Sequence, residues 1–128
     1  MPELETVGFD APPEFITSED AQKAYTYLPE DIEIPKLYED EDTPLDEKVL
    51  LIKLFLPDTR WSWFVTEADR DNGLCFGYVK SGIDPNFDEW GYFSLKELKE
   101  LRSPVTGLPV ERDIWWKPLK FEEAPYED

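Results

Sequence analysis

Three consecutive runs with strand character, separated only by short turns, constrain the fold of this chain most. Residues 49–56 are apolar at seven of eight positions, residues 60–66 alternate between two faces, and residues 74–80 resume strand character after Gly73. Antiparallel strands can be joined by turns this short, whereas parallel strands need a crossover of a dozen or more residues. We therefore predict an antiparallel meander, with residues 49–56 as a central strand covered on both faces.

The residues after the meander predict a helix between two further strands. Residues 90–93 form a fourth strand, and residues 110–116 a last one. Ser94 and Glu97 stand at capping-box spacing, and leucines at every third position make an apolar stripe, so a helix should begin at Ser94 and run to about residue 102. A helix this short must pack on the sheet. We expect an α+β fold: an antiparallel sheet of four or five strands with one capped helix packed on it.

Acidic residues are concentrated in the first third of the chain. Residues 1–48 hold fifteen acidic and three basic residues, a net charge of −12, whereas residues 49–128 hold fifteen and ten, a net of −5. Prolines divide the first third, where only one short helix is predicted, from Ser18 to about Tyr27. The predicted organisation is an acidic, proline-rich arm (residues 1–46), an α+β domain (47–121) and an acidic tail (122–128).

The overall net charge of −17 and the absence of histidine exclude several functions. Such a charge repels nucleic acid and anionic membranes, and no apolar run is long enough to span a bilayer. Without histidine, the commonest general base and metal ligand are missing. Cys75 has no intrachain partner, so we expect a buried, inert thiol in a cytoplasmic protein. No cofactor or metal is expected.

Several short motifs recur in the order seen in a known bacterial family. They are Lys53-Leu54-Phe55 with Pro57, Trp61, Thr66-Glu67-Ala68-Asp69, Phe76-Gly77, Gly91-Tyr92-Phe93-Ser94-Leu95, Glu97-Leu98, Arg102, Gly107-Leu108-Pro109 and Glu111-Arg112-Asp113. Over roughly residues 50–118 the chain resembles the domain-of-unknown-function family 2958. The resemblance implies a small intracellular protein of a plasmid, integrative element or phage, and it implies no activity. The N-terminal third has no counterpart in the resemblance, so a function of the arm would lie outside it.

Our main hypothesis is a protein that binds a basic surface of a host or element-encoded protein, with mimicry of DNA as one form of it. The run Glu39-Asp40-Glu41-Asp42 supplies the charge, and Trp61 is a candidate interface aromatic. The competing explanation of the acidity is solubility alone. The oligomeric state is left open.

The alternative hypothesis is a small carboxylate-dependent enzyme. Glu67, Asp69 and Asp113 would then serve as acid and base groups or as ligands of a divalent metal. In a structural interpretation, Glu67 and Asp69 are a charged pair at the rim of a strand, and Arg112 pairs with its neighbours Glu111 and Asp113 to fasten a strand to a loop. In a functional one, all of these residues line a single polar groove.

Overall fold

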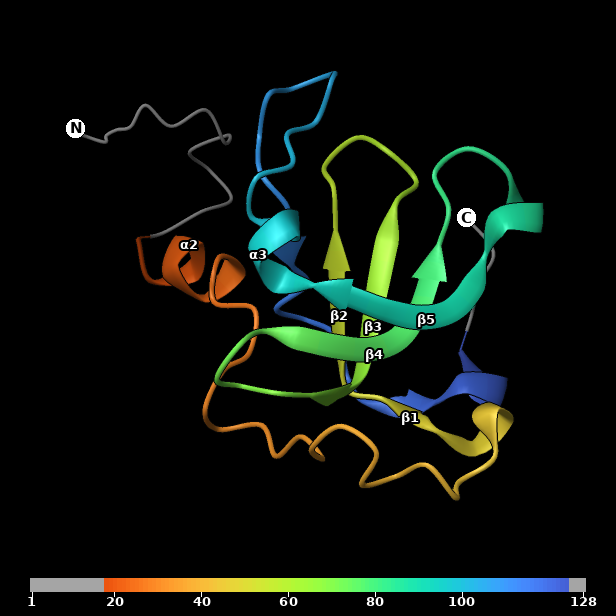
Figure 1. The fold of residues 1–128 in the computed structure, drawn as a ribbon. Coiled ribbons are helices and arrows are strands. Elements are labelled where there is room, and N and C mark those ends of the chain that lie inside the picture. The colour runs from red at the N-terminus through yellow and green to blue at the C-terminus, as the bar shows by residue number, and fades with distance from the viewer. Residues whose placement is uncertain (1–17, 125–128) are drawn as a thin grey trace.

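A computed structural model describes residues 18–124, which are built around a five-stranded antiparallel sheet of order β5-β4-β3-β2-β6 (Figure 1). A second, two-stranded sheet pairs β1 with β7. The strands are β1 Val49–Leu50, β2 Ile52–Phe55, β3 Ser62–Ala68, β4 Leu74–Lys80, β5 Glu89–Ser94, β6 Glu111–Arg112 and β7 Leu119–Lys120. The predicted α+β fold with an antiparallel sheet is confirmed.

The meander β2-β3-β4 forms as predicted, but its first strand is shorter than expected. The apolar run 49–56 is not one central strand, because it breaks at Leu51: β1 pairs with β7, and β2 pairs with β3 and β6. Leu51 donates its N–H to the carbonyl of Val65 at 2.9 Å. Two residues of this run, Leu50 and Leu54, are fully buried although they belong to different sheets. The central strand is β3, in which all seven residues are buried.

Helix α3 (Leu95–Leu98) begins where the sequence predicts and ends earlier. The Ser94 hydroxyl accepts the N–H of Glu97 at 3.4 Å, which confirms the Ser94 half of the predicted capping box. Leu95 and Leu98 are buried, but the third leucine of the predicted stripe, Leu101, is exposed. The helix does not reach residue 102 because the chain there turns away and forms a bridge between Arg102 and Pro109.

Residues of the N-terminal third pack into the same core as the sheet. Tyr27 is buried, and its phenolic hydroxyl donates to the carbonyl of Val110 at 2.6 Å. Ala68 donates its N–H to the carbonyl of Pro35 at 3.0 Å. The core consists of Tyr27, Ile52, Leu54, Leu56, Trp63, Val65, Ala68, Cys75, Leu95, Leu98 and Val110. Residues 18–46 and the sheet therefore share one core across the predicted boundary at residue 46.

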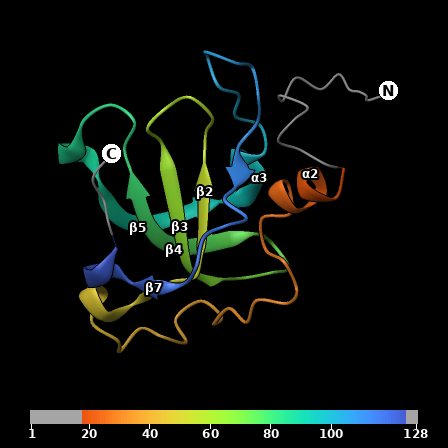
Figure 2. The ribbon, with the colours of Figure 1, turned by 180° about the vertical axis from the view of Figure 1, so that it is seen from behind.

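Helix α2 (Ser18–Ala24) lies beside α3 in both views and ends before the predicted Tyr27 (Figures 1 and 2). The predicted cap by the Ser18 side chain, the first seventeen residues of the arm and the tail beyond residue 124 lie outside the described part of the structure. Within residues 18–124, no helix has the length and apolar character needed to cross a bilayer.

The C-terminal part of the chain differs most from the sequence prediction. Of the strand predicted over residues 110–116 only β6 forms, and β7, after Pro118, was not predicted. The side of the large sheet opposite the core carries aromatic rings: Phe76 packs against Trp90 at 5.8 Å between ring centroids, and Tyr78 against Phe121 at 4.7 Å. We call this side the aromatic face; it adjoins the site described next.

Candidate functional site

A bulge in β3 decides where the carboxylate of Glu67 lies. The pairing of β3 with β4 shifts between Val65 and Glu67, so that Glu67 stands opposite Phe76 and Ala68 stands opposite Cys75. An extra residue in one strand reverses the alternation of its side chains. Ala68 therefore joins the core, and Glu67 lies on the aromatic face. In a regular strand, Glu67 would share the core face with Val65.

Glu67 holds the acidic segment, which we define as residues 38–47, against the sheet. The residue is 3% exposed. One carboxylate oxygen accepts the N–H of Tyr38 at 3.0 Å, and the other accepts the N–H of Asp40 at 2.9 Å. A buried carboxylate requires such partners, and hydrogen bonds to a charged acceptor are the stronger kind. The backbone of the segment is thus tied to the central strand at two points.

Turns within the acidic segment use some of its own side chains. Tyr38 has a φ of +70°, a left-handed conformation that is uncommon outside glycine and persists where its surroundings determine it. The carboxylate of Glu39 accepts the N–H of Lys36 at 2.7 Å, and that of Asp40 accepts the hydroxyl of Thr43. Glu39 and Asp40 therefore help to shape the segment.

Lys48, directly after the segment, turns its charge inward. Lys48 is 3% exposed. Its ammonium donates to the carbonyl oxygen of Asp40 and lies 3.9 Å from a carboxylate oxygen of Asp40. It also lies 5.9 Å from the ring centroid of Phe76, within reach of a cation–π interaction. The buried lysine leaves the exposed surface of the segment acidic. The exposed acidic residues are Glu39, Glu41, Asp42, Asp46 and Glu47.

A cavity of about 460 Å³ lies between the acidic segment and strands β3, β4 and β5. We call it the tyrosine cavity, because Tyr38 and Tyr92 stand in its wall with 60% and 50% of their surface exposed and their ring centroids 6.2 Å apart. A hydrogen bond with the side chain of Tyr38 raises the pKa of Tyr92. The lining residues are Tyr38, Glu41, Asp42, Thr43, Pro44, Leu45, Lys48, Glu67, Phe76 and Tyr92.

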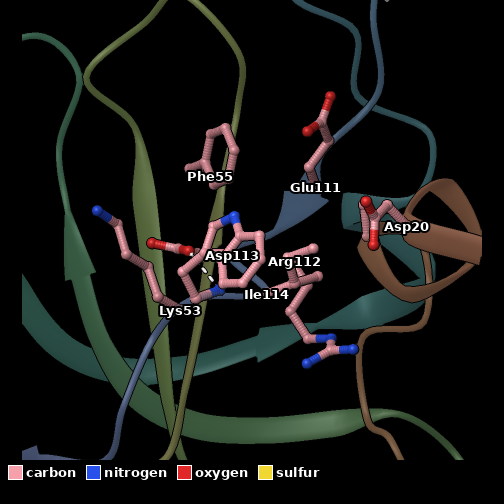
Figure 3. A pocket seen from close by; sticks show the side chains of 9 residues that line it. Asp20, Lys53, Phe55, Glu111, Arg112, Asp113 and Ile114 are labelled. Atoms are coloured by element: carbon pink, nitrogen blue, oxygen red, sulfur yellow. Dashed lines mark hydrogen bonds between the residues drawn. The ribbon is translucent and has the colours of Figure 1, made fainter. Parts of the chain in front are cut away.

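The Glu111-Arg112-Asp113 triplet lines a second cavity, of about 360 Å³, whose wall also includes Asp20 and Lys53 (Figure 3). Glu111 and Asp113 flank Arg112 in the chain, and burial raises the pKa of Glu111. Asp113 donates its N–H to the carbonyl of Lys53 at 2.9 Å, which extends the pairing of β6 with β2. The triplet is therefore half-buried at the edge of the large sheet.

Arg112 fastens the strand to a helix rather than pairing with its neighbours. Its Nε donates to the carbonyls of Lys23 and Thr26, at 3.1 and 2.7 Å, at the C-terminal end of α2. An arginine there satisfies carbonyls that have no partner within the helix. Burial lowers the pKa of Arg112, and the charge of Asp31 opposes that shift. The predicted pairing with the flanking carboxylates is replaced by this contact, which is again structural.

Asp69 and Trp61 serve local structure. A carboxylate oxygen of Asp69 accepts the N–H groups of Asp71 and Asn72, at 2.8 and 3.3 Å, in the turn between β3 and β4. Trp61 stacks on Trp63, with ring centroids 5.9 Å apart, and packs against the core. Trp61 is only half-buried, but its ring is committed to the packing of β3.

The carboxylates of the enzyme hypothesis do not meet in one groove. Glu67 lines the tyrosine cavity and Asp113 the second cavity, while Asp69 lies in the β3–β4 turn. Across residues 18–124, no group of three or more acidic or cysteine side chains is placed to hold a metal ion. Cys75 is fully buried, and burial raises the pKa of its thiol to about 12. The arrangement gives no support to acid–base, metal or thiol chemistry.

Comparison with known families shows to which family the chain belongs. The model of a family described as "Protein of unknown function (DUF2958)" matches residues 32–122, well over half of the sequence. The chain belongs to this family. No curated protein and no solved structure matches the chain. The resemblance seen in the sequence is confirmed, but it extends further than the predicted residues 50–118.

The family match includes the acidic segment. It begins at Ile32, so the expectation that the N-terminal third has no counterpart in the family is wrong from that residue onward. The two halves of the anchoring contact, Glu67 on β3 and the N–H groups of Tyr38 and Asp40, both lie within the matched range. A function of the acidic segment therefore falls inside this family domain.

Three residues of the site were missed by sequence reasoning. Tyr38 and Tyr92 come from segments far apart in the chain, and nothing local indicates that their rings meet. Lys48 is the first basic residue after an acidic run, which is only a weak indication in the sequence that it belongs to the site. Its burial could not be read from that position.

Proposed function

We propose that this protein is a non-catalytic interaction module that binds a basic surface of another protein through its acidic segment. The observation that carries the proposal is the pair of hydrogen bonds that the backbone N–H groups of Tyr38 and Asp40 donate to the carboxylate of Glu67. A segment already fixed in place loses less conformational entropy on binding than a mobile one. Its exposed carboxylates form a preorganised surface of one sign.

Charge complementarity supports the same proposal. The inward-facing Lys48 is held by Asp40, so its charge is compensated within the protein rather than on the surface of the segment. A basic partner would be steered to such a surface, and its association would slow as salt rises. Solubility, the competing explanation of the acidity, depends on net charge and not on where the charges stand. The two explanations therefore predict different results when the positions of the charges are changed at constant net charge.

The proposed setting is the cytoplasm of a bacterium that carries a plasmid, an integrative element or a phage. The family resemblance supports it, since such elements often carry these small proteins. The partner would be a host or element-encoded protein with a basic surface, including one that otherwise holds DNA. Direct binding of nucleic acid is disfavoured by the net charge of −17.

Two charge variants with equal net charge test the proposal. The first changes Glu41, Asp42 and Glu47 to lysine, because all three are exposed residues of the acidic segment, and Glu41 and Glu47 take part in its turns through a backbone N–H. The control changes three exposed residues on other elements: Asp71, Glu89 and Glu100. Each protein serves as bait in capture from the native host, and the recovered proteins are quantified by mass spectrometry. A true partner should be lost with the first variant and kept with the control.

The association rate of the identified partner then completes the test. It should fall with rising salt for the original protein and for the control, and it should be low at every salt concentration for the first variant. Equal recovery and equal rates for the two variants would leave the acidity with its solubility explanation and overturn the proposal. Charge variants are preferable to deletion of residues 1–46, because Tyr27 belongs to the core.

A further inference from the structure

The tyrosine cavity combines aromatic walls with carboxylates at one surface. Tyr38 and Tyr92 are exposed, although rings of this size are usually well covered in a small domain. Phe76 also lines the cavity, with its ring centroid 5.0 Å from that of Tyr92. Glu41 and Asp42 also line the cavity. Exposed aromatic rings beside carboxylates suit a planar organic cation.

The charges within the cavity leave a net attraction for a cation. Glu67 is satisfied by two backbone N–H groups, and Lys48 is paired with Asp40. The other two ionisable carboxylates of the lining, on Glu41 and Asp42, belong to exposed residues. An incoming cation would therefore meet exposed carboxylates and exposed aromatic rings in the same cavity.

We propose that the tyrosine cavity receives an arginine side chain from a basic segment of the partner. This inference rests on the proposed function and names the group that the site recognises. A guanidinium is planar, stacks on aromatic faces and binds a carboxylate through two parallel hydrogen bonds, whereas a lysine ammonium does neither of these as well. The rings of Tyr38 and Tyr92 already touch, so the guanidinium lies over their exposed faces and not between them.

Homopeptides of arginine and of lysine, equal in length, are suitable probes of the cavity. Binding is measured by calorimetry at matched ionic strength, and an NMR titration locates the contact. Tyr92→Leu removes a ring that is half exposed, while Tyr92→Phe keeps the ring and loses the hydroxyl. Phe87→Leu is the matched control, since it removes an exposed ring from the short 3-10 helix (Pro85–Phe87) before β5. The NMR spectrum of each variant checks that it is folded.

The original protein should bind the arginine peptide more tightly than the lysine peptide. Tyr92→Leu should weaken binding of the arginine peptide about fivefold, the size expected of one exposed cation–π contact. Tyr92→Phe and Phe87→Leu should leave it unchanged. The double variant Glu41→Gln with Asp42→Asn should weaken binding of both peptides, because it removes charge from the surface that attracts either one.

The outcomes separate this inference from the proposed function. If the double variant weakens both peptides but Tyr92→Leu has no effect, or if the two peptides bind equally, the arginine site is overturned and the acidic surface still stands. If the double variant changes neither peptide, the proposed function fails along with the arginine site. Loss of binding in Phe87→Leu equal to that in Tyr92→Leu would also overturn the arginine site.

Discussion

Replacing Glu67 with glutamine tests how the acidic segment is held. Glutamine keeps the length and shape of the side chain, but it has one acceptor oxygen in place of two and adds an NH₂ donor. Only one of the N–H groups of Tyr38 and Asp40 can then keep its acceptor. The other N–H group then faces the NH₂ donor of glutamine, at a position where residue 67 is only 3% exposed.

The expected loss of stability follows from these two contacts. A hydrogen bond to a charged group contributes about 1.5–3 kcal/mol and a neutral one about 1 kcal/mol, and a buried unpaired N–H is itself unfavourable. Exchanging two charged bonds for one neutral bond and one unpaired donor should therefore lower the free energy of unfolding by about 3 kcal/mol. That is a large share of the roughly 5–15 kcal/mol that stabilises a typical domain.

Urea unfolding measures this loss, and amide hydrogen exchange shows where it arises. The amides of Tyr38 and Asp40 should exchange faster in Glu67→Gln, while those of β4 and β5 should change only as global stability does. Glu100→Gln, at an exposed site, is the control and should stay within about 0.5 kcal/mol of the original protein. A loss below about 0.5 kcal/mol, with unchanged exchange at both amides, would refute the anchoring role of Glu67.

Three further predictions concern the core. The Cys75 thiol, whose pKa burial raises to about 12, should react with thiol reagents only as fast as the protein unfolds; rapid labelling of the native protein would contradict its burial. Burial also raises the pKa of Tyr27 from 10.0 to about 12, so the native state holds this proton more tightly than the unfolded state. The Tyr27 hydroxyl should therefore not affect stability below pH 10, and stability should fall from pH 10 toward about pH 12. Tyrosinate absorbance and circular dichroism would follow this fall, and constant stability across that range would refute the prediction. Gly77→Ala should prevent folding, because the added Cβ would stand 1.7 Å from the carbonyl oxygen of Phe64; a native-like NMR spectrum would be the contrary result.

The elements that the sequence predicts well are those whose determinants are close together in the chain. The cap at Ser94 needs only Glu97, three residues on, and the β3–β4 turn needs only the residues around Gly73, which has a φ of +77°. The break at Leu51 and strand β7 depend instead on a distant pairing, in which Leu50 stands opposite Leu119. Strands of two residues have no periodicity to detect.

The candidate site shows the same limit. Glu67 was selected from the sequence as a possible rim carboxylate, but its burial depends on a bulge that no residue pattern marks. Arg112 was expected to pair with its neighbours in the chain, and it bonds instead to Lys23 and Thr26, more than eighty residues away. Residue types can nominate charged groups, but their partners are decided by contacts between distant segments.

The way the acidic segment is held favours recognition over solubility as the origin of its charge. Tyr38 adopts a left-handed conformation, and Glu67 and Lys48 are both buried, each of which is unfavourable without compensating contacts. Carboxylates on a mobile loop would raise solubility equally well, since that effect depends on net charge. A binding surface, by contrast, benefits directly from fixed carboxylates, because less entropy is lost when the partner docks. If recognition is the reason, Glu67→Gln should weaken partner binding as well as folding, although the exposed carboxylates of the segment are unchanged. Equal affinity of the folded variant and the original protein for a captured partner would remove this argument for recognition.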